Sequence, residues 1–125
     1  MVANTLTDQL IIVGKSLLKE LDDSGIIIDT ALWFQFIEEK SWKLMLSFPN
    51  IEEVGPKAVY KKVQKALSKI EEKETLSLDD VVIAKPYSPL INSLKLAFHK
   101  CKNITISNSV IDGQLISGAY IYRIE

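Results

Sequence analysis

The chain has 125 residues, of which 47% are hydrophobic and 25% are charged, and its formal net charge at pH 7 is -1. This length predicts one globular domain over residues 1–125. The near-neutral charge excludes a general electrostatic attraction to nucleic acid or to an anionic membrane, and no apolar run is long enough to cross a bilayer.

Two features of the sequence predict a cytoplasmic location. The first residues, MVANTLTDQL, lack the basic start and the apolar centre of a signal peptide. The single cysteine, Cys101, cannot form an internal disulfide, which is usual for proteins of a reducing compartment.

The first predicted element is a helix over residues 6–21. Val13 and four leucines recur there at steps of three or four residues, so they share one face of the helix. Gly25 is the expected left-handed residue that follows its end.

A hairpin over residues 30–48, TALWFQFIEEKSWKLMLSF, forms the centre of the predicted fold. Its strands are joined by a polar turn at residues 38–40. The predicted register places six large apolar side chains on one face, in the pairs Phe36–Trp42, Phe34–Leu44 and Leu32–Leu46. Trp33, Gln35 and Met45 then lie on the opposite face.

A second helix begins at Gly55-Pro56, because proline suits the first helical position. Its apolar stripe consists of Val59, Val63, Ala66, Leu67 and Ile70. Lysines occupy much of its remaining surface, at Lys57, Lys61, Lys62, Lys65 and Lys69.

The remaining elements complete an α+β pattern. The apolar run of residues 81–84 predicts a buried strand in parallel pairing, and Ser88-Pro89 begins a third helix. Residues 104–124 predict a hairpin that turns at Asp112-Gly113 and carries a bulge at Gly118. The predicted fold class is α+β, a mixed sheet of about five strands (two hairpins plus a central strand) with three helices.

Three stretches resemble small bacterial proteins that have no assigned function. They are NSVIDGQLISGAYIYRI near the C-terminus, ALWFQF with SWKLMLSFP in the first hairpin, and the helix start at Gly55-Pro56. The resemblance covers most of the chain and implies no activity, cofactor or partner.

One set of residues has the types that a metal-dependent nuclease uses. Such a site needs two carboxylates on a divalent cation and a lysine near the attacked phosphate, and Asp29, Glu38 and Lys40 supply these groups. The predicted hairpin separates Asp29 by a full strand from the turn that holds the other two, which argues against a shared metal.

Two other candidate sites are incomplete. His99 and Cys101 are the only histidine and the only cysteine, whereas a zinc site needs three or four protein ligands. Residues 85–88 lead into a helix N-terminus that could receive an anion, but Pro86 and Pro89 remove backbone donors there. We therefore predict no catalytic residue, no metal ligand and no cofactor.

This lack of a catalytic set favours a non-enzymatic interaction or regulatory module with a protein partner. One alternative is a nuclease-like enzyme that uses Asp29, Glu38 and Lys40. The other is a nucleic-acid binder that uses the lysine face of the second helix.

A homo-oligomer is also predicted, from the expected position of the helices. Two right-handed crossovers between neighbouring strands would place all three helices on one face of the sheet. The open face would carry Trp33, Met45, Tyr120 and Tyr122, with Ile124 beside them, and such residues are enriched at protein interfaces. The alternative is that one helix covers this face, which gives three layers and a monomer.

Overall fold

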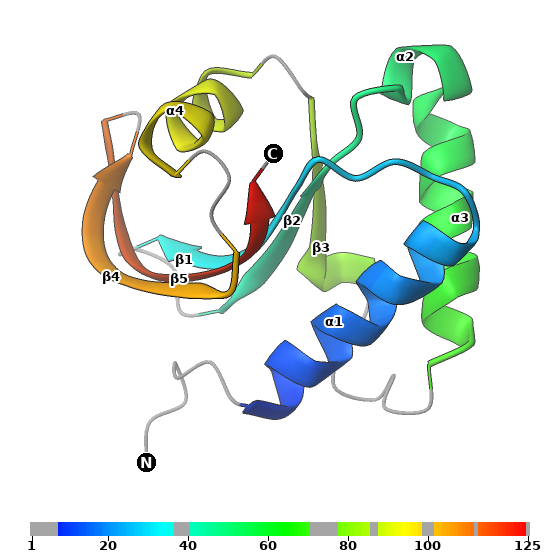
Figure 1. The fold of residues 1–125 in the computed structure, drawn as a ribbon, viewed down its shortest axis with the longest axis horizontal. Coiled ribbons are helices and arrows are strands. Elements are labelled where there is room, and N and C mark those ends of the chain that lie inside the picture. Colours follow the sequence, from blue (N-terminus) through cyan, green and yellow to red (C-terminus); the bar gives the residue numbers. More distant parts are fainter. Residues whose placement is uncertain are drawn as a thin grey trace.

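The structure of the protein, a computed structural model, is built on one five-stranded sheet (Figure 1). It describes residues 8–36, 41–70, 78–85, 88–98, 102–111 and 113–124. The helices are α1 (Asp8–Asp23), α2 (Ile51–Val54), α3 (Pro56–Ser68) and α4 (Pro89–Phe98), with a 3-10 turn, η2, at Leu78–Asp80. The strands are β1 (Thr30–Phe36), β2 (Lys43–Ser47), β3 (Val81–Ala84), β4 (Ile104–Ile111) and β5 (Gln114–Ile124).

The predicted α+β class is confirmed by these elements. The strand order is β3-β2-β1-β5-β4, and the sheet is mixed because β2 and β3 are parallel while the other pairs are antiparallel. In the described part of the chain, α1, α3 and α4 are the three long helices, as predicted, and the short elements α2 and η2 are additional. The strand predicted at residues 81–84 pairs in parallel as expected, but it lies at an edge of the sheet.

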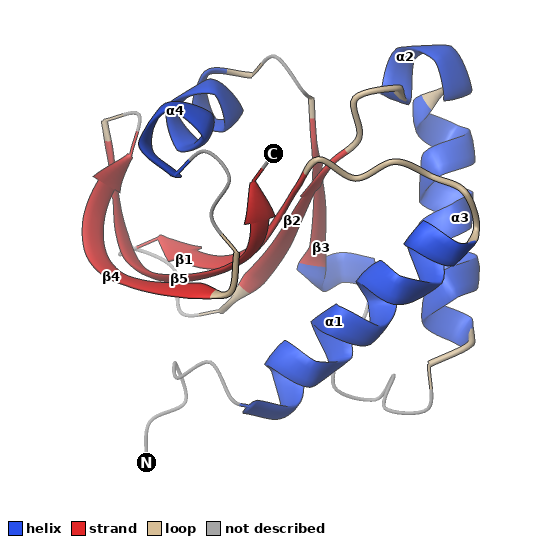
Figure 2. Cartoon of the chain, viewed as in Figure 1, coloured by secondary structure: helices blue, strands red, loops and turns tan. Residues whose placement is uncertain are grey.

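The helices cover both faces of the sheet (Figure 2). Helices α1 and α3 pack on one face in a core that includes Trp33 and Leu44, which we call the α1-side core. Helix α4 packs on the other face in a core that includes Phe34 and Met45, which we call the α4-side core. The prediction that all helices share one face is wrong. The strands β3 and β4 lie at opposite edges and run in opposite directions, so the rule for parallel crossovers does not apply to α4.

The predicted register of the first hairpin is wrong by one residue. Trp33 pairs with Leu44 and Phe34 pairs with Lys43, so Phe34 is not opposite Leu44. Register is specified by a hydrophobic pattern only when one face is buried and the other is wet. Here helices cover both faces, and every side chain from Ala31 to Gln35 is buried, so the alternation carried no information about the pairing.

The surface predicted to form a homo-oligomer is not present. Trp33 and Met45 lie on opposite faces of the sheet, and both are buried, as is Tyr122. Helix α4, which was expected on the same face as α1, covers one face of the sheet, and α1 covers the opposite face. The homo-oligomer therefore stays a prediction that lacks this surface.

Two irregularities in β5 determine which way its side chains point. The pairing with β1 shifts between Gly118 and Ile116, as the predicted bulge at Gly118 requires. It shifts again between Ile121 and Arg123, so Tyr122 is an extra residue in β5. A bulge of this kind re-aims the side chains next to it. Consequently Ile124 belongs to the α4-side core, and its predicted position beside Tyr122 is wrong.

Local signals for turns and helix starts are confirmed. Gly25 follows α1 with φ of 86°, in the left-handed region. The N–H of Ile91 donates to the Ser88 hydroxyl at 3.3 Å, so Ser88 caps α4. Ile111 pairs with Gln114 and Gly113 has a φ of 73°, as the predicted two-residue turn requires, while Asp112 itself lies outside the described residues.

Candidate functional site

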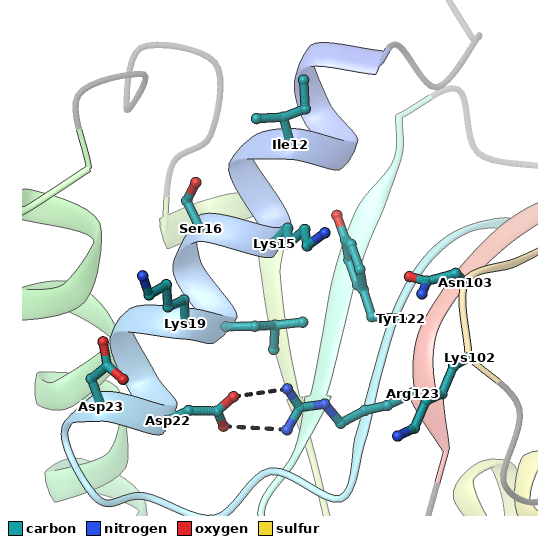
Figure 3. A pocket seen from close by; sticks show the side chains of 11 residues that line it. Ile12, Lys15, Ser16, Lys19, Asp22, Asp23, Lys102, Asn103, Tyr122 and Arg123 are labelled. Atoms are coloured by element: carbon teal, nitrogen blue, oxygen red, sulfur yellow. Dashed lines mark hydrogen bonds and ion pairs between the residues drawn. The ribbon is translucent and has the colours of Figure 1, made fainter.

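An open cleft of about 740 Å³ lies between α1 and the neighbouring ends of β4 and β5 (Figure 3). Small-molecule sites have volumes of roughly 300–1,000 Å³. Helix α1 supplies one wall, Tyr122 and Arg123 of β5 supply the other, and Lys102 and Asn103 form the rim just before β4. No element that the structure describes closes the cleft, so a ligand could enter it directly from solvent.

The bulge in β5 brings both Tyr122 and Arg123 to this cleft. In a regular strand, consecutive side chains point to opposite faces. Because Tyr122 is the extra residue of a bulge, it and Arg123 both line the cleft beside α1. The irregular pairing therefore places an aromatic ring and a guanidinium side by side.

Arg123 is bound at the floor of the cleft. Its Nη2 lies 2.8 Å from Asp22 Oδ2 and its Nη1 lies 3.2 Å from Asp22 Oδ1, so the contact is bidentate (Figure 3). Nη1 also donates to the carbonyl of Ile28 at 3.3 Å. The guanidinium is thus held at the end of α1 and at the segment that leads into β1.

Among the described residues, positive charge prevails in the cleft. Four cationic side chains, Lys15, Lys19, Lys102 and Arg123, line it against two carboxylates, Asp22 and Asp23. Within the described residues, the ion pairs in the structure do not include any of the three lysines. An exposed ammonium group without a bound carboxylate attracts anions from solution. The exposed Ile12 adds an apolar surface at the other end of the cleft (Figure 3).

Hydrogen bonds and close packing hold the wall behind the cleft. Trp33 Nε1 donates to the Tyr122 hydroxyl at 2.8 Å, and this hydroxyl donates to the carbonyl of Ile11 at 2.6 Å. The helix comes this close because residue 14 is glycine. A Cβ on Gly14 would lie 2.8 Å from Trp33 Nε1 and closer still to the Tyr122 hydroxyl. The wall is therefore held by a buried hydrogen bond between β1 and β5 and by a second hydrogen bond from Tyr122 of β5 to α1.

Burial raises the pKa of the Tyr122 phenol well above its usual value. The hydrogen bond from Trp33 acts in the opposite direction, and the neighbouring Tyr120 raises the pKa further. A phenol with a raised pKa keeps its proton at neutral pH. Tyr122 is therefore suited to hold α1 against the sheet and unsuited to act as a general base.

The nuclease candidate Asp29 lies away from this cleft, under α4. Its Oδ2 is 2.7 Å from Lys95 Nζ, and its side chain is 14% exposed. Its N–H donates to the carbonyl of Ser47 at 3.1 Å, while the strand register pairs Thr30 with Ser47. The carboxylate is thus engaged by a lysine of α4. Glu38 and Lys40, its proposed partners, lie outside the described residues.

Three buried oxygen atoms near Asp29 have no hydrogen-bond partner within the described residues. They are Asp29 Oδ1, Thr30 Oγ1 and Ser47 Oγ. Thr30 and Ser47 face each other across β1 and β2 and are fully buried. Unpaired buried hydroxyls cost stability, or else they bind ordered water.

The other residues singled out from the sequence do not assemble into a site. His99, Cys101, Pro86 and Tyr87 lie outside the described residues. The Ser88 hydroxyl is occupied in capping α4. The described residues contain no group of three His, Cys, Asp or Glu side chains that could hold a metal ion. The lysines of α3 are exposed, as predicted, and its apolar stripe is buried.

The residues of the cleft were not predicted as a site. Lys15 and Lys19 are four residues apart and so lie on one face of α1. A stronger signal was available in the composition, because Arg123 is the only arginine among 15 basic residues. Arginine and lysine differ in their ability to bind planar oxyanions, so a lone arginine among lysines was a position worth singling out.

Comparisons with protein-family models, with curated proteins and with solved structures found no match to this chain. The resemblance to small bacterial proteins therefore stays a prediction. Among the described helices, none combines the length and the apolar character that crossing a membrane requires.

Proposed function

We propose that the protein is a non-enzymatic, cytoplasmic binding module that accepts a small organic anion in the cleft between α1 and β5. The observation that carries this proposal is the excess of cationic groups, since Lys15, Lys19 and Lys102 surround the cleft without a bound carboxylate from the described residues. The exposed side chain of Ile12 favours a ligand that also has an apolar part.

The chemistry of the cleft supports binding more than catalysis. Its charged groups attract and orient an anion, whereas acid–base catalysis needs a group that exchanges its proton near neutral pH. Tyr122, whose pKa is raised, does not do so. The single cysteine supports the proposed location in a reducing compartment, the cytoplasm.

Isothermal titration with phenyl phosphate tests the proposal, with benzyl alcohol as the uncharged probe. We expect the wild-type protein to bind phenyl phosphate and not benzyl alcohol. The triple variant K15Q/K19Q/K102Q should bind at least about tenfold more weakly, because it removes the anion-attracting charges. The matched control is K57Q/K61Q/K65Q, which removes three exposed lysines of α3 outside the cleft.

The outcome separates site binding from charge effects. Affinity should fall with rising ionic strength, because salt screens exposed charges. An equal loss in both triple variants would show that only overall charge matters, and the absence of binding by the wild-type protein would disprove the proposal.

A second candidate function is nucleic-acid binding through α3. The specific observation is that α3 contains four exposed lysines and no acidic residue, with Lys69 immediately after it. Phosphate contacts of this kind are independent of sequence and depend strongly on salt. Fluorescence anisotropy with single-stranded and double-stranded oligonucleotides tests it. Binding that is lost in K57Q/K61Q/K65Q and kept in K15Q/K19Q/K102Q would favour α3 over the cleft.

A further inference from the structure

The contact between Arg123 and Asp22 has the geometry of a bound ligand. Two parallel N–H···O contacts, of 2.8 and 3.2 Å, join a guanidinium to a carboxylate inside the cleft. Arginine recognises carboxylate and phosphate groups in this same bidentate form. In this structure, the carboxylate bound to Arg123 belongs to Asp22 of the same chain.

The position of Asp22 at the C-terminal end of α1 is unfavourable in itself. It lies in the last turn of α1, together with Asp23, and no basic residue is present in that turn. The C-terminal end of a helix carries partial negative charge, so carboxylates there are unfavourable. The interaction with Arg123 compensates for this at Asp22, whereas Asp23 has no ion pair within the described residues.

Asp22 is not the only group that holds Arg123 in place. Its Nη1 also donates to the carbonyl of Ile28, and its strand pairs with β1 at Ala31. The side chains of Arg123 and Asp22 are 24% and 39% exposed, so a ligand in solution can reach both partners, and salt weakens the interaction between them. An incoming oxyanion can therefore replace Asp22 without disrupting the fold.

We infer that Asp22 is an internal competitor for the ligand of the cleft. In the free protein its carboxylate occupies the oxyanion position on Arg123, and the carboxylate or phosphate group of the ligand displaces it. This inference rests on the function proposed for the cleft. It assigns the ligand class as an organic oxyanion, bound in the bidentate form by Arg123 and surrounded by the three lysines.

A double-mutant cycle at Asp22 and Arg123 tests the inference. The variants are D22N, R123Q and D22N/R123Q, titrated with phenyl phosphate and with phenylacetate to distinguish the two oxyanions on one apolar body. We expect D22N to bind roughly twofold to fivefold more tightly than wild type, the range set by the strength of a partly exposed ion pair. R123Q should weaken binding without abolishing it, because the three lysines remain in the cleft, and D22N should give no gain in the R123Q background.

The charge-matched comparison is D23N, at the neighbouring residue of the same helix turn. Removal of a negative charge alone should raise the affinity in D23N less than in D22N, and this gain should persist in the D23N/R123Q background. Equal gains for D22N and D23N, or a gain from D22N that survives R123Q, would overturn the competition while leaving anion binding intact. No binding by any variant would overturn the proposed function as well.

A structural readout accompanies the affinities. Because Arg123 is the only arginine, its Nε–H group gives one arginine side-chain signal in a proton–nitrogen correlation spectrum. We expect this signal to shift in D22N and again when either probe is added to the wild-type protein. A signal that does not respond to a probe that binds would overturn the inference, because the ligand would then avoid Arg123.

Discussion

The indole N–H of Trp33 on β1 donates a 2.8 Å hydrogen bond to the hydroxyl of Tyr122 on β5, 89 residues further along the chain. Tyr122 in turn donates to the carbonyl of Ile11 on α1. The hydroxyl thereby connects two strands and a helix within the α1-side core. The positions of both walls of the cleft depend on this connection.

Tyr122→Phe should lower the free energy of unfolding by about 1–3 kcal/mol, because it leaves the buried N–H of Trp33 and the carbonyl of Ile11 without their partner. Denaturant unfolding measures this. The matched control is Tyr120→Phe, which should matter little because, within the described residues, the Tyr120 hydroxyl makes one exposed hydrogen bond of 3.3 Å, to Asn103. A similar loss in both variants would contradict the importance of the buried hydrogen bonds.

Stability should fall at alkaline pH because of Tyr122. Its pKa in the folded protein lies above the unfolded value, which is about 10. Above that pH the unfolded chain releases the proton while the folded protein keeps it, so the free energy of unfolding decreases as pH rises. Below it, this residue causes no pH dependence. Denaturant unfolding across the alkaline range should show a steeper decrease in wild type than in Tyr122→Phe, and Tyr60→Phe on exposed Tyr60 should retain the wild-type slope.

Gly14→Ala should destabilise the protein, although alanine is the better helix former by about 1 kcal/mol. The added Cβ would collide with the Tyr122 hydroxyl and with Trp33 Nε1, so α1 would have to move away from the sheet. Thermal unfolding measures the effect. The control is Gln9→Ala on an exposed position of the same helix, which should be neutral or slightly stabilising. A stabilised Gly14→Ala variant would show that α1 packs less closely.

Thr30→Val should stabilise the protein by about 1 kcal/mol. It replaces a buried hydroxyl that has no partner within the described residues by a methyl group of similar size. The control is Thr105→Val, at an exposed position of β4, where little change is expected. Denaturant unfolding shows whether the Thr30 hydroxyl is unpaired or binds an ordered water molecule. A clear loss of stability would mean that an ordered water molecule binds the hydroxyl.

Magnesium or manganese should not raise the melting temperature. Asp29, the described member of the nuclease candidate, is bound to Lys95, whose ammonium group competes with a metal ion. A ligand that binds only the folded state raises the melting temperature, so thermal unfolding in a metal titration is a direct test. A rise that disappears in Asp29→Ala would restore the nuclease hypothesis.

The parts of the fold that could be predicted depend on local signals. The apolar stripe of α3, the left-handed Gly25 and the turn at residues 112–113 each follow from a few neighbouring residues. The register of the first hairpin could not be predicted, because Ala31 to Gln35 are all buried and both faces look apolar in the sequence. A periodic pattern distinguishes two faces only when they differ.

The cleft could not be predicted because it depends on contacts between distant residues. Asp22 and Arg123 are 101 positions apart, and nothing in the sequence states that α1 lies beside β5. The bulge at Tyr122 adds a second difficulty. Strict alternation assigns Tyr122 and Arg123 to opposite faces, whereas the pairing shift brings both to the cleft.

The central strand β1 has a consequence for how the protein is made. It pairs with β5, so one edge of β1 has no partner until the chain through Ile124 has left the ribosome. At a synthesis rate of about 5–20 residues per second, β1 and β2 exist for several seconds before β5 is made, and the sheet is incomplete during this time. The nascent chain therefore exposes an unpaired apolar strand edge, and such edges promote aggregation. Folding of the sheet is completed only after translation of its last strand.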